Sequence, residues 1–342
     1  MIDLSEWPVE EGYYKLGEFE VERGGVIREA RLGWQTHGTL SAKLDNVIIY
    51  PCSYTATHHD LSWLIRPGGI LDPTKWFIVI PDMFSNGISS SASEEADFPE
   101  LVTMRDNVFA QRRMMKEQFG VEEVAAVYGF SMGAGQAFHW AAEFPDAVDK
   151  AIIVCGSART SVHNQVFLSG LLRILEAAPQ YLGGGRFSSE PEAAIRAFGQ
   201  VYAGWGLSQD FYRAGLHMSA LGASNLTDFL VSQWEDSFLQ HRAADLYSQA
   251  RTWYEADISA SQKYGGDLGK ALSAITAKVL LLPSESDLYF RVADNAAELE
   301  YLTRGELHPI PSIWGHRAGS PIGNPEDEEF IRVNVERWLQ AD

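Results

Sequence analysis

The chain has 342 residues, of which 46% are hydrophobic and 21% are charged, and its formal net charge is −19. This composition is typical of a globular protein with enough apolar residues for a sizeable core. The negative charge argues against nucleic acid or an anionic membrane as a partner, because phosphate binding needs a basic surface. No window has the length of apolar sequence that spans a bilayer.

The first residues of the chain and its two cysteines indicate where in the cell the protein is expected. Residues 1–17 show no basic region followed by an apolar stretch, so no secretory signal peptide is predicted. Cys52 and Cys155 each end an apolar run, and two cysteines are too few for a disulfide framework. We therefore expect two buried thiols and a soluble protein of the cytoplasm.

The first half of the chain alternates between strand-like and helix-like patterns. Such alternation favours right-handed crossovers and a mostly parallel sheet with helices on both faces. In chain order, the predictions are two extended segments within 17–37 joined at Gly24-Gly25, strands at 46–51 and 76–81, a Gly- and Ser-rich loop at 82–93, a helix at 101–119, and strands at 124–128 and 151–155.

The alternation stops between 157 and 274, where no convincing strand run is found and the composition favours helices. It resumes with a strand at 278–283, a helix near 291–302, a strand near 306–310 and a last helix near 327–339. We therefore predict a catalytic domain made of 1–156 and 275–342, with 157–274 inserted as a helical cap, or lid.

A Gly-x-Ser-x-Gly pentapeptide, Gly129 to Gly133, lies between the strand predicted at 124–128 and a helix-like run. A turn this tight needs residues without Cβ two positions before and after the serine. Ser131 would then stand at the start of the helix, where free backbone N–H groups favour developing negative charge. The pattern predicts a nucleophile, although a small-residue packing turn would look the same.

A serine nucleophile needs a histidine base that is oriented by a carboxylate. Glu285 and Asp287 follow the strand after the cap, and Asp287 is preferred because it is farther from the strand end and shorter. His316 follows Gly315 in the loop after the last strand, whereas His308 lies within that strand and is expected to be structural. The order serine, acid, histidine predicts the triad Ser131, Asp287 and His316.

The tetrahedral oxyanion of acyl transfer needs backbone N–H donors. The N–H of Met132, next to the nucleophile, is one candidate, and the loop after the strand at 46–51 supplies the other, for which Tyr54 is preferred. The neighbouring loop residues Ser53 and Thr55 are candidates for substrate binding.

The remaining histidines show no comparable pattern. His58 and His59 are adjacent in what is expected to be an extended loop, where their side chains would point apart, so neither a metal nor a cofactor is predicted. His59 is a further candidate for lining the pocket. His139 is expected to be packed, and His217 and His241 in the cap could be surface or pocket residues.

Two stretches resemble the homoserine O-acetyltransferase family of α/β-hydrolases. They are GGVIREARLGWQTHGTLSAKLDNVIIYPC, which resembles the family's opening, and GFSMGAGQAFHWAAEFPDAVDKAIIV, which resembles its elbow, helix and next strand. The resemblance implies the α/β-hydrolase fold, the triad and an oxyanion hole near Tyr54. It also implies that a homodimer could form through the cap helices.

The resemblance fails where an acyl acceptor would bind. Arg317 follows His316 where the family usually has an aspartate that holds the amino group of homoserine, and the cap lacks the family's GL-x-x-AR stretch. These differences favour water as the acceptor, and hence a hydrolase of a small acyl ester. The alternatives are an acyltransferase that uses acyl-CoA and a non-catalytic binding protein. Further candidates for contact with substrate are Trp314 and Arg317. The cap aromatics Trp205, Tyr212, Trp234 and Trp253 could line an apolar pocket, although large aromatic residues in helices more often belong to the core.

Overall fold

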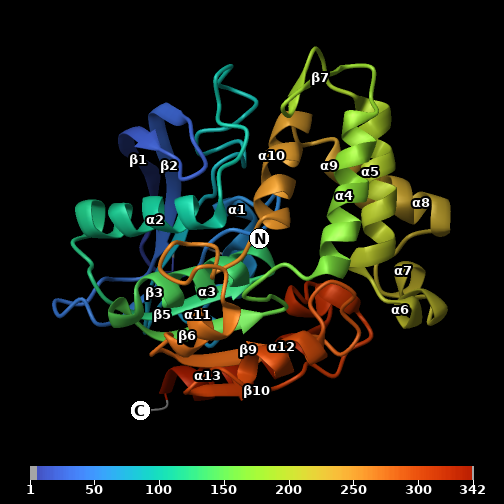
Figure 1. The fold of residues 1–342 in the computed structure, drawn as a ribbon. Coiled ribbons are helices and arrows are strands. Elements are labelled where there is room, and N and C mark those ends of the chain that lie inside the picture. Colours follow the sequence, from blue (N-terminus) through green and yellow to red (C-terminus); the bar gives the residue numbers. More distant parts are fainter. Residues whose placement is uncertain (1–5, 341–342) are drawn as a thin grey trace.

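The computed structural model describes residues 6–340, so the first five residues of the stretch read for a signal peptide lie outside the described residues. One sheet of eight strands forms the centre, in the order β1-β2-β4-β3-β5-β6-β9-β10 (Figure 1). The strands are β1 (Val9–Glu20), β2 (Val26–His37), β3 (Val47–Ile49), β4 (Phe77–Pro81), β5 (Val124–Phe130), β6 (Val148–Val154), β9 (Lys278–Leu282) and β10 (Gly305–Leu307).

The sheet is mostly parallel, as the sequence predicts. β1 and β2 form an antiparallel hairpin, and β2 pairs antiparallel with β4. All other neighbouring strands pair in parallel. Because parallel strands need crossover connections, the chain passes along both faces of the sheet between them.

Alternate residues of each central strand pack against different layers. Val47 and Ile49 of β3 join a core cluster that includes α2 and α3, whereas Ile48 joins a cluster that includes α13. This period of two places helices on both faces of the sheet and explains why the central strands read as unbroken apolar runs.

The α-helices that precede α4 or follow α10 are α1 (His58–Leu61), α2 (Met104–Phe119), α3 (Met132–Glu143), α11 (Leu268–Ser273), α12 (Val292–Leu299) and α13 (Pro325–Gln340). Of these, α2, α3, α12 and α13 follow the predicted helices closely, whereas α1 lies where an extended loop was predicted and α11 lies within the 157–274 segment. Thr103 caps α2, accepting a hydrogen bond from the Asp106 N–H, and Gly120 ends it in the left-handed conformation.

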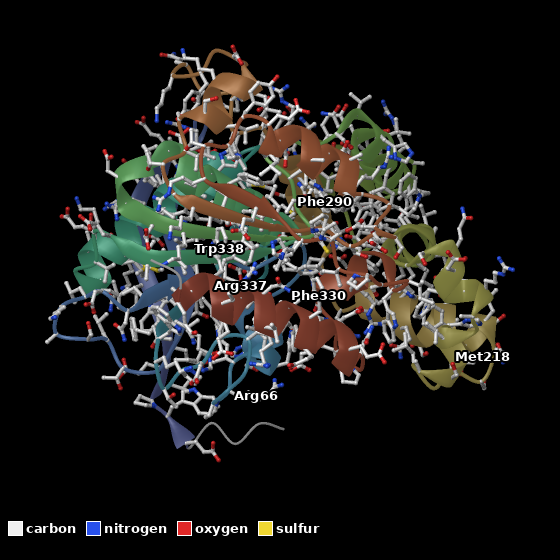
Figure 2. All side chains as sticks on the ribbon, turned by 90° about the horizontal axis from the view of Figure 1, so that it is seen from below. Arg66, Met218, Phe290, Phe330, Arg337 and Trp338 are labelled. Atoms are coloured by element: carbon white, nitrogen blue, oxygen red, sulfur yellow. The ribbon has the colours of Figure 1, made fainter. Side chains whose placement is uncertain are left out.

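The last helix, α13, covers one face of the sheet, and Figure 2 views the molecule from this side with Phe330 and Trp338 labelled. Ile331 and Trp338 are buried in the core, and Phe330 packs against it. Arg66, also labelled, forms an ion pair with Glu328 and joins the turn after α1 to this helix.

The helices of the segment predicted as a cap stand beside the carboxyl ends of the strands, and they are called the cap helices below (Figure 1). They are α4 (Val162–Glu176), α5 (Glu192–Gly206), α6 (Gln209–Arg213), α7 (Leu216–Ser219), α8 (Leu226–Leu230), α9 (Asp236–Phe238) and α10 (Ala243–Tyr254). A π-helical turn at Val231–Glu235 joins α8 to α9.

Two features of the 157–274 segment differ from its predicted all-helical character. The strands β7 (Tyr181–Gly183) and β8 (Arg186–Phe187) form a small antiparallel hairpin around the run of three glycines. All three glycines have positive φ, which explains why a helix cannot continue there. At the carboxyl end of the segment, Ile258 and Tyr264 pack with residues of α2 and α3 in a core cluster of the sheet and are therefore part of the sheet's core.

Both predicted buried thiols are confirmed, since Cys52 and Cys155 are free and buried. Over residues 6–340, none of the helices combines the length and apolar character that a membrane crossing requires.

Candidate active site

Ser131 occupies the turn between β5 and α3, with φ 56° and ψ −123°. Few non-glycine residues adopt positive φ, and such strain is typical of a nucleophile elbow. A Cβ on Gly129 would lie 2.2 Å from the Gly133 carbonyl oxygen, and one on Gly133 would lie 2.5 Å from that of Pro51. The two flanking glycines are therefore required by close backbone contact, for the reason inferred from the sequence.

The structure brings together the three residues predicted as a triad. His316 Nε2 lies 2.8 Å from Ser131 Oγ, and His316 Nδ1 lies 2.7 Å from Asp287 Oδ2. All three residues are buried. With its Nδ1–H donating to the carboxylate, the imidazole keeps Nε2 free to accept the serine proton.

Backbone groups fix the acid of this arrangement. Asp287 Oδ1 accepts hydrogen bonds from the N–H groups of Tyr289 at 2.8 Å and Phe290 at 3.2 Å, which leaves Oδ2 for His316. Glu285, the alternative acid, is exposed. The loop between β9 and α12 thus turns Asp287 alone toward the histidine.

Cys155 lies beside the triad but is not a rival nucleophile. Its Sγ, a carboxylate oxygen of Asp287 and a ring nitrogen of His316 all lie within 4.8 Å of one another. Burial, reinforced by the charge of Asp287, raises the pKa of the Cys155 thiol well above its usual value. A thiol that stays protonated is a poor nucleophile.

Aromatic rings enclose the histidine. Tyr289, Phe130 and Phe290 have ring centroids 4.7, 4.8 and 5.4 Å from that of His316. Tyr289 and Phe290 were not singled out from the sequence. Their contact with His316 could have been predicted from their position two and three residues after Asp287, because the loop that carries the acid must also pass the histidine.

The loop after β3 is tied to both the elbow and the cap. Ser53 Oγ donates to the Phe130 carbonyl oxygen at 2.5 Å, and the Thr55 N–H donates to Gln249 Oε1 at 2.8 Å. The Tyr54 hydroxyl donates to the Leu246 carbonyl oxygen at 2.9 Å. The side chain of Ser53 and the N–H of Thr55 are therefore already engaged within the protein.

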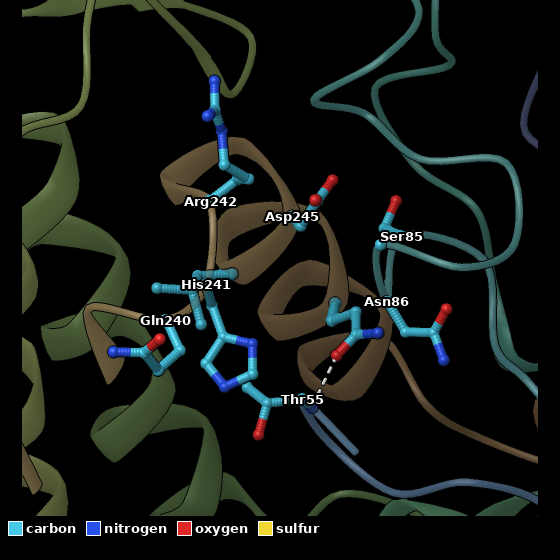
Figure 3. Close-up of a pocket in the computed structure, with 10 residues that line it drawn as sticks. Thr55, Ser85, Asn86, Gln240, His241, Arg242 and Asp245 are labelled. Atoms are coloured by element: carbon cyan, nitrogen blue, oxygen red, sulfur yellow. Dashed lines mark hydrogen bonds between the residues drawn. The ribbon is translucent and has the colours of Figure 1, made fainter. Parts of the chain in front are cut away.

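The contact between this loop and α10 was not predicted from the sequence. Gln249 is buried on that helix, far from Thr55 in sequence, so no local pattern connects the two. Figure 3 shows the pocket where α10 meets Thr55 and the 85–87 loop, with His241 and Asp245 pointing toward it. Ser131 is not among the ten described residues that line this pocket.

Burial raises the pKa of Asp245 to about 6. Its carboxylate accepts two hydrogen bonds from Ser93, at 2.9 Å from the backbone N–H and 2.6 Å from the hydroxyl. These two hydrogen bonds lower the pKa of Asp245 and so partly oppose the effect of burial. They also join the cap helix α10 to the loop after β4.

Trp314 and Arg317, the other predicted substrate contacts, flank the histidine in sequence. Trp314 is buried and packs edge-on against Phe211 of α6, with ring centroids 5.3 Å apart. The Arg317 guanidinium lies 6.0 Å from the Trp314 ring centroid, and burial lowers its pKa. Trp314 thus joins the histidine loop to the cap, and Arg317 packs against Trp314 within that loop.

The four cap aromatics divide into two pairs. Trp253 and Trp205 contact Tyr289, with ring centroids 5.6 and 6.4 Å apart. Trp234 packs against Tyr202, and Tyr212 packs against Phe211, Phe229 and His217. Of these four residues, only Trp253 and Trp205 contact one of the rings that enclose His316.

The prediction that His58 and His59 lie in an extended loop and point apart is wrong. The two residues begin the short helix α1, and their ring centroids are 4.0 Å apart. Consecutive side chains diverge by only about 100° around a helix, whereas they alternate across an extended strand.

The other histidines are placed as follows. His139 is packed inside α3, as predicted, and burial lowers its pKa to about 4. His308 follows β10 and contacts Asn334 and Glu306. His217 is buried in the cap and His241 lines the pocket of Figure 3.

Known proteins resemble this chain over most of its length. A family model described as "alpha/beta hydrolase fold" matches residues 69–316. A probable esterase from Corynebacterium glutamicum is 34% identical, over 92% of this chain and 93% of its own. An ethyl acetate hydrolase from Pseudomonas veronii is 33% identical, over 88% of this chain and 87% of its own.

Solved structures agree with these relatives. That of the acetyl esterase MekB superposes with a TM-score of 0.92 at 30% identity, covering 98% of this chain and 97% of its own. A homoserine O-acetyltransferase from Bacillus anthracis has a TM-score of 0.85 at 23% identity, over 98% of each chain. At that identity the second likeness shows the fold alone.

Proposed function

The chain belongs to the alpha/beta hydrolase fold family, and from this premise we propose that it hydrolyses small acyl esters through an acyl-enzyme on Ser131. Relatives that carry esterase names support ester hydrolysis as the activity. The observation that carries the assignment of residues is the chain of contacts from Ser131 through His316 to Asp287, at 2.8 and 2.7 Å.

Each group has a defined step in the proposed reaction. His316 Nε2 takes the hydroxyl proton while Ser131 Oγ attacks the ester carbonyl, and Asp287 stabilises the imidazolium that forms. The N–H groups of Met132 and Tyr54 face the oxyanion. The imidazolium then protonates the departing alcohol, and water, activated by the same histidine, releases the acid from Ser131.

Packing around the serine supports a short acyl group. The rings of Tyr289 and Phe290 lie against His316, and Trp253 packs against both of them. These side chains are buried, and Trp253 belongs to the cap helix α10. An acetyl group fits beside such rings more readily than a long chain, which would have to displace them.

The direct test is the hydrolysis of p-nitrophenyl acetate. The unaltered protein should turn it over, and Ser131→Ala should lower kcat by up to about 10⁶-fold, because the nucleophile is lost. Ser188→Ala, at an exposed serine of the small hairpin, is the matched control and should keep the full rate. Full activity in Ser131→Ala would exclude the acyl-enzyme.

Acyl transfer is the second candidate, because the fold also matches a homoserine O-acetyltransferase. Transfer requires a bound alcohol that reaches the acyl-enzyme before water. We expect acetyl-CoA to release free thiol at the same rate with and without homoserine, since Arg317 stands beside the histidine instead of an acidic residue. Thiol release that depends on homoserine would favour the transferase.

Three finer predictions stay part of this proposal. They are a homodimer through the cap helices, a cytoplasmic location and a cap spanning 157–274 as a structural unit. Sedimentation at several protein concentrations tests the first, and limited proteolysis at the ends of that segment tests the last.

A further inference from the structure

A second group of side chains, remote in sequence from the triad, has the composition of a metal site. Glu11 on β1 meets His58 and His59 on α1. One ligand atom from each, a carboxylate oxygen or a ring nitrogen, lies within 4.8 Å of the other two. Two imidazoles and one carboxylate are typical ligands of zinc and of neighbouring first-row metals.

The most informative atom of this group is His58 Nε2. The side chain is buried, and this nitrogen has no hydrogen-bond partner although it is inaccessible to solvent. It points toward Glu11, whose Oε2 lies 3.5 Å away, within ion-pair range when the ring is protonated. A buried nitrogen without a partner costs free energy, which a bound cation would offset.

The other nitrogen of the same ring fixes the tautomer that metal binding requires. His58 Nδ1 lies 2.5 Å from Oδ2 of Asp82, which is fully buried. The other oxygen, Oδ1, accepts from the His58 N–H at 2.9 Å and from Asn86 Nδ2 at 2.7 Å. A carboxylate that holds one imidazole nitrogen so that the other can bind metal is a common arrangement around zinc.

Glu11 is oriented by a chain of hydrogen bonds of its own. Its Oε2 accepts from Gln35 Nε2 at 3.1 Å, and Gln35 Oε1 lies 2.8 Å from His37 Nε2. The Trp7 indole donates to His37 Nδ1 at 3.0 Å, so the neutral His37 ring carries its proton on Nε2 and donates to Gln35. Gln35 must then present its N–H₂ group to Glu11.

The distances suit a small tetrahedral ion. Ligand bonds of 2.0–2.2 Å place neighbouring ligand atoms about 3.3–3.5 Å apart. The separation of Glu11 Oε2 from His58 Nε2 is 3.5 Å, and from His59 Nδ1 it is 3.9 Å. His59 and Glu11 are more than half exposed, so both can adjust, and the fourth position would open to water.

From this geometry we propose that Glu11, His58 and His59 bind one divalent first-row transition metal ion, with Zn²⁺ preferred. The ion would join β1 to α1, which directly follows the loop that carries Tyr54. It would thereby stabilise the start of α1, where Asp82 already holds both the backbone and the ring of His58.

Calorimetric titration with Zn²⁺ of the full chain, made without a histidine tag and treated with chelator, tests this site. We expect one Zn²⁺ per chain, and substituted Co²⁺ should show the visible absorption of a tetrahedral site. Mg²⁺ should not compete, because it prefers oxygen ligands and octahedral geometry. Since Glu11 and His59 are exposed, Glu11→Gln and His59→Ala should fold normally. Each should weaken Zn²⁺ binding by at least about 10- to 100-fold, the loss that is typical when only a partner of a ligand is removed.

The matched control is His308→Ala, which removes a histidine that lies 3.0 Å from Glu306 but has no second imidazole beside it. It should leave Zn²⁺ affinity unchanged. Absence of stoichiometric Zn²⁺ binding, or equal binding by the Glu11→Gln/His59→Ala double variant, would overturn the proposal. Thermal denaturation of every variant serves as the check of folding and does not depend on esterase activity, so the metal site and the serine mechanism can fail independently.

Discussion

At the residue scale, the chemistry rests on side chains that the backbone holds in one orientation. Ser131 is fixed by a strained φ, and Asp287 by two backbone N–H groups on the oxygen that does not face His316. Such preorganisation matters because a catalytic group that must reorient during the reaction loses much of its effect.

The choice between the two acids after β9 can be tested directly. Asp287→Asn should lower kcat for p-nitrophenyl acetate by about 10⁴-fold, because the amide favours the wrong tautomer of His316. Glu285→Gln changes a carboxylate two residues away that is exposed, and should leave kcat unchanged. The reverse result would assign the acid to Glu285 and contradict the geometry of this loop.

At the element scale, α3 approaches the strands closely enough that its glycines are required. The helix packs against β5 and β6, and the carbonyl oxygen of Pro51, two residues after β3, reaches the Gly133 position. The same approach places the loop that carries Tyr54 beside the start of α3. The positions of α3, β3 and the loop after β3 therefore depend on the close contact between Gly133 and the Pro51 carbonyl oxygen.

Gly133→Ala tests this contact. Its Cβ would lie 2.5 Å from a backbone oxygen that cannot move aside, so we expect a loss of about 1–3 kcal/mol in the free energy of unfolding, measured by urea denaturation. The control is Gly170→Ala in α4, where a Cβ meets nothing within 4 Å and should stabilise the helix by about 0.5–1 kcal/mol. Equal effects at both positions would contradict the close approach.

At the scale of the whole molecule, a buried carboxyl joins the sheet domain to the start of the cap segment. Glu298 on α12 accepts from the Ala158 N–H and from Asn295 Nδ2, both at 2.8 Å. Asn295 also donates to the Gly156 carbonyl oxygen at 2.9 Å. Burial raises the pKa of Glu298 to about 8, and these hydrogen bonds only partly oppose it.

This raised pKa predicts how global stability depends on pH. The unfolded chain releases the Glu298 proton near pH 4.5 and the folded chain only near 8, so this group's contribution to the free energy of unfolding falls as pH rises through that window. The slope is at most about 1.4 kcal/mol per pH unit. Glu298→Gln should remove it in urea denaturation at several pH values.

The exposed Glu300, at the end of the same helix, is the control for this measurement. Glu300→Gln should keep the wild-type slope of stability against pH between about 4.5 and 8. A Glu298→Gln variant with the wild-type slope would show that another group titrates in that range.

Local patterns determined much of the fold. The strands at β3, β4, β5, β6 and β9 could be predicted because each is an apolar run bounded by turn residues. The resemblance to the homoserine O-acetyltransferase family, which rests on two motif stretches, correctly implied the α/β-hydrolase fold. The hairpin at 181–187 was missed because its strands are only three and two residues long, too short for a period of two to be seen.

Residues close in sequence to a recognisable motif were also predictable. The sequence predicted three side chains, from the pentapeptide around Ser131 and from the order of Asp287 and His316 along the chain. The structure brings these side chains within hydrogen-bonding distance. This succeeded because the carboxyl ends of parallel strands meet at one edge of a sheet, so loops after different strands must converge there.

Contacts across the fold needed the tertiary structure. Gln249 meets Thr55 from 194 residues away, and Glu11 meets His58 and His59 only because β1 passes beside α1. The sequence by itself determined the central strands of the sheet, its longer flanking helices and the order in which the triad residues follow, since all of these depend on local pattern. Only the tertiary structure decided which distant polar groups face each other, because burial and hydrogen-bond direction depend on how the elements pack.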